Sequence, residues 1–376
     1  MRWGRAAAVA AVAVAGAGAA ALAAGRAVSD LAVRPKDRAP AGSEGLRVHA
    51  AAPGQVELTR GAETLRAGHY ALEWDADSAG GGAGRAVVGE VLASTPQTVV
   101  RRLENGTAPS VGTAVRITPR VLVGDPETAL GLDFTETRVR GELGEMPAWY
   151  LSGARDLWVV AVHGDGWDRQ QVLPVLPVLR RLKVPVLAVT YRNDQGAPRS
   201  PDGIGHFGAT EWRDVEAAMQ LALASGAGRI VLYGWSVGAT MALHAAHDSA
   251  WRDSVRGLVL DSPVLDLHGT ARRRATRHGV PEALAGLGAR AAEGRTGADT
   301  AAVDRLAQGA DLRAPVLLMH SPDDSVAPVG PARRLAARRD DLVMYREFPG
   351  AEHEALWNTD PHAYEDTVRR FLTPLL

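Results

Sequence analysis

The chain of 376 residues has no cysteine and little lysine, which occurs only at Lys36 and Lys183. The missing cysteine excludes disulfides, thiolate metal sites and a cysteine nucleophile, and it leaves the redox compartment open. Acidic and basic residues nearly balance, at a formal net charge of −1, so no global field would attract nucleic acid or acidic polymers. We therefore expect no nucleic-acid partner.

Signatures of metal and cofactor binding are also missing. The histidines have no metal-ligand spacing, there is no Walker-type loop, and the glycine run from Gly80 to Gly84 neither ends a strand nor opens a helix. We therefore expect no metal and no cofactor. The remaining composition, with 46% hydrophobic and 23% charged residues, is typical of a globular protein with a buried core.

A long uncharged run at the N-terminus extends from Ala6 to Ala24, with Arg2 and Arg5 before it and Arg26 after it. This layout is typical of a signal peptide or an uncleaved signal anchor, and the run is close to the roughly 20 residues that span a bilayer. It is mostly alanine and offers a small-residue cleavage site at 21–23. We predict membrane targeting, as an anchor at the cell membrane in preference to an exported protein. Arginines on both flanks leave the sidedness open, and a buried Ala-rich helix is the alternative.

The sequence divides into four predicted segments. Residues 1–27 are the signal anchor or signal peptide, 28–44 a polar linker, 45–130 a small β-rich domain and 131–376 the catalytic domain. Alternating apolar residues in the β-rich domain predict strands at 55–58, 70–74, 87–92 and 115–117. We expect no chemistry from this domain.

After Phe134 the pattern changes to continuous apolar runs that alternate with helical spacing. Such runs are typical of strands that are covered on both faces, so the pattern predicts an α/β fold with a mostly parallel central sheet flanked by helices. A helical cap is expected at about 265–312. The predicted strands are 157–162, 186–189, 230–233, 257–260, 316–319 and 342–345, and the predicted helices are 211–224 and 363–372.

The pentapeptide Gly234-Trp235-Ser236-Val237-Gly238 joins a predicted strand to a stretch with helical spacing. A serine on such a turn is strained and projects its hydroxyl above the sheet edge, so Ser236 is the predicted nucleophile. Glycine is expected at positions 234 and 238 because side chains there would clash as the helix folds back over the strand. The alternative is a glycine-rich turn with an idle serine.

Two loops are expected to supply backbone donors for an oxyanion. The N–H of Val237 lies at a predicted helix start, where a free donor and the helix dipole favour negative charge. The turn His163-Gly164-Asp165-Gly166 follows the strand predicted at 157–162. We predict the Asp165 N–H as the second donor, with that of Gly164 next. A flexible turn is the alternative, and His163 itself is expected to be structural.

The segment His320-Ser321-Pro322-Asp323-Asp324 closes the strand predicted at 316–319. We predict Asp324 as the carboxylate that accepts the Nδ1–H of a catalytic histidine and stabilises its imidazolium. The adjacent Asp323 competes for this role, as does Asp261, which ends the preceding predicted strand. An N-cap or a turn is the structural alternative.

His353 is the only histidine in the loop 349–354, which follows the last predicted strand. A neutral imidazole titrates near pH 6.5, so it can accept the serine proton and return it to the leaving group. A loop histidine is usually solvated surface. The chain order Ser236, Asp324, His353 is, however, the order that accompanies this type of nucleophile turn, and it predicts His353 as the base.

From about Phe134 to its end, the chain resembles the α/β-hydrolase superfamily, on the branch of serine aminopeptidase-like and monoacylglycerol lipase-like hydrolases. It is similar to uncharacterised actinobacterial members with an N-terminal membrane segment. The resemblance implies a Ser-His-Asp mechanism at Ser236, His353 and Asp324. Where related hydrolases often have Tyr-Arg-Gly, this chain has Tyr191-Arg192-Asn193-Asp194, and the role of that loop stays open. Besides the segments above, the motifs that carry the resemblance are Glu211-Trp212-Arg213-Asp214, Leu260-Asp261-Ser262-Pro263 and Gly350-Ala351-Glu352-His353.

These observations predict hydrolysis of carboxylic esters through an acyl-enzyme, with lipid-like acyl groups favoured by the predicted membrane segment. A serine peptidase or aminopeptidase of the same fold is the alternative, because triad chemistry does not choose between ester and amide. A catalytically idle binding domain is a further alternative, although such domains usually lack a triad member. The arginines at 272–274 and 277 are interpreted as a solvated helix face, with contact to an anionic headgroup as the alternative.

Overall fold

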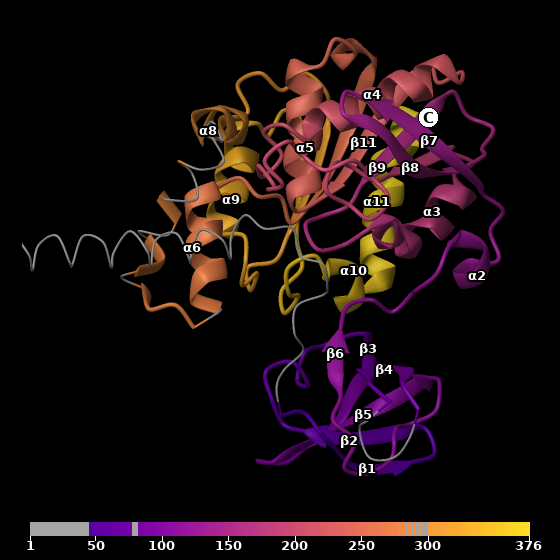
Figure 1. Ribbon diagram of the computed structural model, residues 1–376, viewed down its shortest axis with the longest axis vertical. Helices are drawn as coiled ribbons and strands as arrows, with labels where there is room; N and C mark the ends of the chain where they lie inside the picture. Colours follow the sequence, from indigo (N-terminus) through magenta and orange to yellow (C-terminus); the bar gives the residue numbers. More distant parts are fainter. Residues whose placement is uncertain are drawn as a thin grey trace, which may run out of the picture.

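The computed structural model shows two β-sheets, with helices packed around the larger one (Figure 1). It describes residues 45–76, 82–277, 279–282, 284–286, 289–290, 294 and 300–376. The predicted signal segment at 1–27 and the predicted linker at 28–44 lie outside these residues. Among the described residues, no helix is long and apolar enough to cross a bilayer.

The smaller sheet has six strands in the order β1-β2-β5-β4-β3-β6, and all its neighbouring strands are antiparallel. Alternating residues of these strands, such as Val56 and Leu58 of β2, point into one apolar core. This sheet confirms the predicted β-rich region, although strands β1 and β5 were not among the predicted ones. The bounds are β1 Val48–Ala52, β2 Gln55–Thr59, β3 Tyr70–Trp74, β4 Gly84–Ser94, β5 Thr98–Asn105 and β6 Arg116–Thr118.

The larger sheet has eight strands in the order β14-β13-β12-β11-β9-β10-β8-β7. The six strands from β14 to β10 in this order run parallel, and the hairpin β7–β8 adds two antiparallel strands at one edge. The predicted α/β fold with a mostly parallel sheet is therefore confirmed. The bounds are β7 Thr135–Gly141, β8 Gly144–Leu151, β9 Leu157–Val162, β10 Val186–Val189, β11 Arg229–Trp235, β12 Val255–Asp261, β13 Val316–His320 and β14 Val343–Glu347.

Helices cover both faces of the larger sheet because its central strands are apolar on both faces. Along β9, Val160 and Val162 pack in a core that includes residues of α4 and α5, whereas Val159 and Ala161 pack in a core that includes residues of α3 and α11. The helices are α2 Pro126–Leu130, α3 Leu176–Arg181, α4 Trp212–Ala224, α5 Val237–Asp248, α6 Leu267–Arg277, α8 Thr300–Gln308, α9 Val329–Arg338, α10 Leu356–Thr359 and α11 Pro361–Leu372.

The hairpin β7–β8 was missed by the sequence patterns. Strand β7 lies at the edge of the sheet, and only Val139 among its residues is fully buried, so the strand has no apolar run to reveal it. The short helix α2 was also not expected, and it depends on a capping box formed by Asp125 and Thr128. Of the cap expected at about 265–312, the structure describes the helices α6 and α8, which Figure 1 shows beside the sheet, while part of the segment between them lies outside the described residues.

Candidate active site

Ser236 lies on the tight turn between β11 and α5, as the pentapeptide predicted. Its φ of 50° is in the left-handed region that residues other than glycine rarely adopt. The N–H of Ser236 donates to the carbonyl oxygen of Asp261 at 2.9 Å, which ties the turn to the end of β12. The turn is thus strained and held in place from the neighbouring strand.

The two glycines that flank this turn are required for different reasons. A Cβ on Gly234 would lie 2.5 Å from the N atom of Ala239, so this glycine lets α5 fold back over its own strand, as expected. A Cβ on Gly238 would instead lie 2.2 Å from the carbonyl oxygen of Val162, at the end of β9. Gly238 therefore permits close packing against the neighbouring strand, which the local sequence did not indicate.

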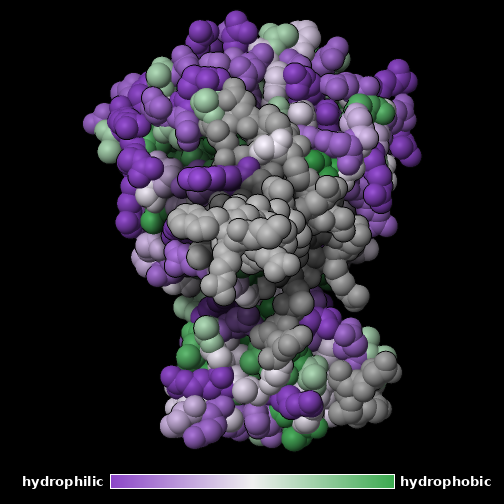
Figure 2. All heavy atoms as spheres, turned by 60° about the vertical axis from the view of Figure 1, so that its left-hand side comes forward, coloured by the Kyte–Doolittle hydropathy of each residue, from purple (hydrophilic) through white to green (hydrophobic). Residues whose placement is uncertain are grey.

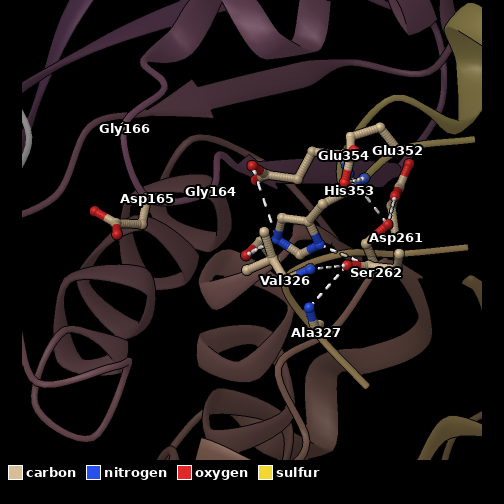
Figure 3. Close-up of polar contacts among 12 residues, drawn as sticks. Gly164, Asp165, Gly166, Asp261, Ser262, Val326, Ala327, Glu352, His353 and Glu354 are labelled. Carbon is tan, nitrogen blue, oxygen red and sulfur yellow. Dashed lines mark hydrogen bonds and ion pairs between the residues drawn. The ribbon is translucent and has the colours of Figure 1, made fainter. Parts of the chain in front are cut away.

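The structure brings Ser236, His353 and Asp324 into one hydrogen-bonded chain, and Figure 3 labels the histidine at its centre. The Oγ atom of Ser236 lies 2.8 Å from Nε2 of His353, and Nδ1 of His353 lies 2.7 Å from Oδ2 of Asp324. All three residues are buried or nearly so. This arrangement can pass a proton from a serine hydroxyl to an imidazole that a carboxylate orients.

Asp324 is held as a carboxylate by donors on both of its oxygens. Oδ1 accepts the N–H groups of Val326 at 2.8 Å and Ala327 at 2.7 Å, while Oδ2 faces His353 and lies 3.2 Å from Nε2 of His320. Burial alone would raise the pKa of Asp324, but His353 and then His320 outweigh it and hold this pKa well below its ordinary value. His320 is a residue that sequence reasoning missed, and its position at the end of β13 was the available signal.

The pKa of His353 is set by opposing influences. Burial disfavours the imidazolium, but the charge and hydrogen bond of Asp324 outweigh it, and Glu354 adds to them, so the pKa of His353 lies above its ordinary value. A raised pKa makes the neutral imidazole a stronger base and shifts the pH at which it becomes neutral upward.

The two alternative acids do not contact His353. Asp323 Oδ2 accepts the N–H of Gly350 at 2.7 Å and so holds the loop before His353. Asp261 is fully buried, where its oxygens accept the hydroxyls of Ser262 at 2.8 Å and Tyr364 at 2.7 Å. Of the three candidates, only Asp324 is hydrogen-bonded to the histidine.

The predicted oxyanion donors differ in availability. The N–H groups of Val237 and Asp165 have no acceptor among the described residues, so both are free to bind a substrate oxygen. The N–H of Gly164, in contrast, donates to Oε1 of Gln171 at 2.7 Å. The side chain of Asp165 points away from His353 (Figure 3) and forms a 2.7 Å ion pair with Arg274.

Glu354 is a second residue of the site that sequence reasoning missed. Its carboxylate is turned toward the imidazole (Figure 3), with Oε2 3.9 Å from Nε2 of His353, and Oε1 accepts Nε2 of Gln171 at 3.3 Å. Its backbone φ is 58°. Burial raises the pKa of Glu354 above its ordinary value, although His353 and Gln171 oppose this. Its position directly after the predicted base was the only signal, because burial cannot be read from a loop.

The loop with the unusual motif Tyr191-Arg192-Asn193-Asp194 has a structural role. Asp194 Oδ2 accepts Nε2 of His163 at 2.8 Å and the N–H of Tyr191 at 2.8 Å, so His163 is structural, as expected. Arg192 forms a buried bidentate ion pair with Asp214 of α4, in which two hydrogen bonds of 2.8 Å join the guanidinium to the two carboxylate oxygens. This loop therefore anchors His163, at the start of the turn predicted to supply an oxyanion donor, and the helix α4.

The interpretation of the α6 arginines as a solvated helix face is wrong for Arg274 and in part for the half-buried Arg273, whereas Arg272 and Arg277 are exposed. Arg274 is only 7% exposed and pairs with Asp165, while Arg273 Nη1 donates to the carbonyl oxygen of Asp324 at 2.6 Å and Arg277 Nη1 donates to Ser325 Oγ at 2.8 Å. The helix covers the acid loop, so its cations face carbonyl and carboxylate oxygens. In the part of the chain that the structure describes, no three His, Cys, Asp or Glu side chains form a metal-binding group.

Comparisons with known proteins agree with the fold. The model of the family described as "Alpha/beta hydrolase family" matches residues 159–367, and that of a "Domain of unknown function (DUF8805)" matches residues 47–118. No curated protein matches the chain significantly.

Several solved structures resemble the chain. The Pyrococcus furiosus esterase Pf2001 is 20% identical, and the match covers 68% of this chain and 96% of the esterase, with a TM-score of 0.56. An alpha-beta serine hydrolase homologue from Coxiella burnetii is 16% identical, over 64% of this chain and 97% of its own, with a TM-score of 0.45. The serine hydrolase CCSP0084 from Cycloclasticus zankles is 14% identical, over 65% and 99%, with a TM-score of 0.47. At 20% identity, the likeness to the esterase shows the fold.

Proposed function

Because this chain belongs to the alpha/beta hydrolase family, we propose that it is a serine hydrolase that cleaves carboxylic esters through an acyl-enzyme. The observation that carries the proposal is the hydrogen-bonded chain from Ser236 through His353 to Asp324. A domain used only for binding would have no need to keep three such groups in contact and buried.

The proposed reaction has two halves. Ser236 Oγ attacks the ester carbonyl carbon while His353 Nε2 takes the hydroxyl proton, and the N–H groups of Val237 and Asp165 stabilise the negative oxygen. When the C–O bond to the leaving group breaks, His353 returns the proton to the alcohol. A water molecule then loses a proton to His353 and attacks the acyl-enzyme, and Ser236 is released with its proton restored.

Labelling with a fluorophosphonate tests the nucleophile. We expect labelling of the wild type and none of Ser236→Ala, with turnover reduced about 10⁶-fold in the variant. Ser225→Ala, which alters an exposed serine at the end of α4, should label normally. Labelling that persists in Ser236→Ala would overturn the proposal.

A substrate panel then separates esters from amides. We expect p-nitrophenyl esters to be cleaved faster than aminoacyl amides, and the esterase named among the similar structures supports this order. Faster cleavage of aminoacyl amides would establish the alternative, a serine peptidase or aminopeptidase.

Membrane attachment through residues 1–27 is part of the proposal, because it favours lipid-like acyl groups as substrates. We expect the full chain in the membrane fraction of cells, with the sidedness read from protease access, and a chain lacking residues 1–27 in the soluble fraction. Equal distribution of both chains would rule out this attachment.

A further inference from the structure

The small β domain (β1 to β6) contacts the catalytic domain at the segment that carries the base. Nη2 of Arg66 lies 2.6 Å from Oε2 of Glu352, the residue directly before His353. Both side chains are largely buried, at 22% and 17% exposure. Figure 2 shows the molecule narrowing between the two parts.

The other oxygen of Glu352 binds both catalytic loops. Oε1 accepts the N–H of His353 at 3.2 Å, the N–H of Ser325 at 3.2 Å and the hydroxyl of Ser325. Ser325 directly follows Asp324. One carboxylate thus connects an arginine of the β domain to the neighbours of the proposed base and of the proposed acid. The hydrogen bond of Ser325 and the charge of Arg66 lower the pKa of Glu352 against the effect of burial, which keeps it ionised.

A second contact holds the far end of the same segment. The N–H of His69 donates to the carbonyl oxygen of Asn358 at 2.8 Å, and Nδ2 of Asn358 donates at 2.8 Å to the carbonyl oxygens of His69 and Pro119. A Cβ on Gly68 would lie 2.0 Å from the Asn358 carbonyl oxygen, so only glycine permits this approach. Ala355, between the two contacts, is buried in the apolar core of the β domain.

A third contact reaches the oxyanion loop. Just after β6, Nη2 of Arg120 donates to the carbonyl oxygen of Gly166 at 2.5 Å, and its guanidinium stacks over the ring of Trp167 at 4.4 Å from the centroid. The β domain and its exit segment therefore touch the loops of the proposed base and of the proposed oxyanion donor directly, and they reach the loop of the proposed acid through Glu352.

We propose that the β domain is a brace for the active-site loops, in which Arg66 acts through Glu352 as a positioning residue for His353 and Asp324. This inference rests on the proposed function. Loops at the end of a sheet are the most mobile part of such a site, and displacement by about 1 Å can cost about 100-fold in rate. Three contacts, two with the segment 352–358 and one with the loop at Gly166, account for a domain that supplies no reacting group.

The test uses the full chain with Arg66→Met and a matched control. The control is Arg102→Met, which breaks an ion pair with Glu90 within the same small sheet, where the two side chains are 53% and 62% exposed. We expect Arg66→Met to lower kcat about tenfold with KM unchanged, because the reacting groups are misplaced while the substrate surface remains intact. Arg102→Met should match the wild type, and Arg66→Lys should recover part of the loss.

Two further measurements separate positioning from loss of folded protein. Looser contact with Asp324 lowers the pKa of His353, so the acidic limb of kcat/KM should move to lower pH in Arg66→Met. The low-field Nδ1–H proton resonance of His353, assigned by its loss in His353→Gln, should shift or broaden. The proposed bracing role is disproved if Arg66→Met matches Arg102→Met in both the pH profile and the proton resonance. It is also disproved if Arg66→Met loses activity only in proportion to the loss of folded protein. If the wild type has no Ser236-dependent turnover, the proposed function fails, and the proton resonance still decides whether Arg66 positions the histidine.

Discussion

Two carboxylates lie at the ends of neighbouring parallel strands, and they have opposite properties. Asp261 ends β12, and Asp324 lies in the loop directly after β13. Both are buried, and from the sequence each was a candidate for the acid that orients His353.

Their surroundings explain the difference. Asp324 accepts two backbone N–H groups and faces two imidazoles, and against the effect of burial His353 and His320 hold its pKa well below the ordinary value. Asp261 has only the hydroxyls of Ser262 and Tyr364, and burial raises its pKa to about 7. The comparison teaches that a strand end places a carboxyl group near a site, while the neighbouring donors decide whether it stays charged. Only a charged group can stabilise an imidazolium.

The largest expected effect separates the two residues by activity. We expect Asp324→Asn to lower kcat about 10⁴-fold, because the histidine loses both its orientation and its charge partner. Asp261→Asn should lower kcat less than about tenfold, since Asp261 is linked to the Ser236 turn only by its carbonyl oxygen, which accepts the N–H of Ser236. Steady-state kinetics on a p-nitrophenyl ester measure both. A loss in Asp261→Asn as large as that in Asp324→Asn would reverse the assignment.

The second effect concerns stability. The folded pKa of Asp261 is about 7 and its ordinary value is 3.8, so between these values the folded state keeps a proton that the unfolded state has released. Stability should therefore fall as pH rises through this window, by up to about 1.4 kcal/mol per pH unit. We expect Asp261→Asn to show a flatter dependence in urea unfolding from pH 4 to 7. The same slope in both proteins would show that Asp261 ionises normally.

A smaller effect is expected from the second imidazole. His320→Phe keeps a ring but removes the donor to Asp324, so the pKa of Asp324 should rise toward its ordinary value. We expect kcat to fall about tenfold, which corresponds to the loss of about 1.5 kcal/mol for one hydrogen bond to a charged group. Unchanged kcat in a correctly folded variant would mean that His353 and the loop N–H groups are enough to hold Asp324 as a carboxylate.

The smallest expected effect is a shift of the pH profile. Only the neutral imidazole accepts the serine proton, so kcat/KM should fall as pH drops through the raised pKa of His353. Glu354 raises this pKa and Arg274 lowers it. Glu354→Gln should therefore move the acidic limb to lower pH and Arg274→Met to higher pH. Shifts in the same direction would exclude direct electrostatic action on His353.

Much of the framework was predictable from local pattern. The strands from 157 to 347 that carry the site were recognised because residues buried on both faces form continuous apolar runs. Ser236 was recognised because a strand, two glycines and a helix start are all contiguous in the chain. The edge hairpin β7–β8 was missed because a half-exposed strand leaves no such run.

Other features depended on residues that are far apart in the chain. Arg66 and Glu352 meet across 286 positions, and no periodicity records that encounter. The same holds for Gln171 and Glu354, which are separated by 183 positions. Arg274 of α6 was misread because a charged helix face looks solvated until another element covers it.

The sequence by itself therefore determined the fold class, the strained serine turn and the candidate residues at the strand ends, because each depends on bonded neighbours or on a regular repeat. Only the tertiary structure decided which carboxylate meets His353, which N–H groups stay free and what the β domain touches. These outcomes depend on burial and on charges that approach through space, and a carboxylate has no settled pKa until its neighbours are in place.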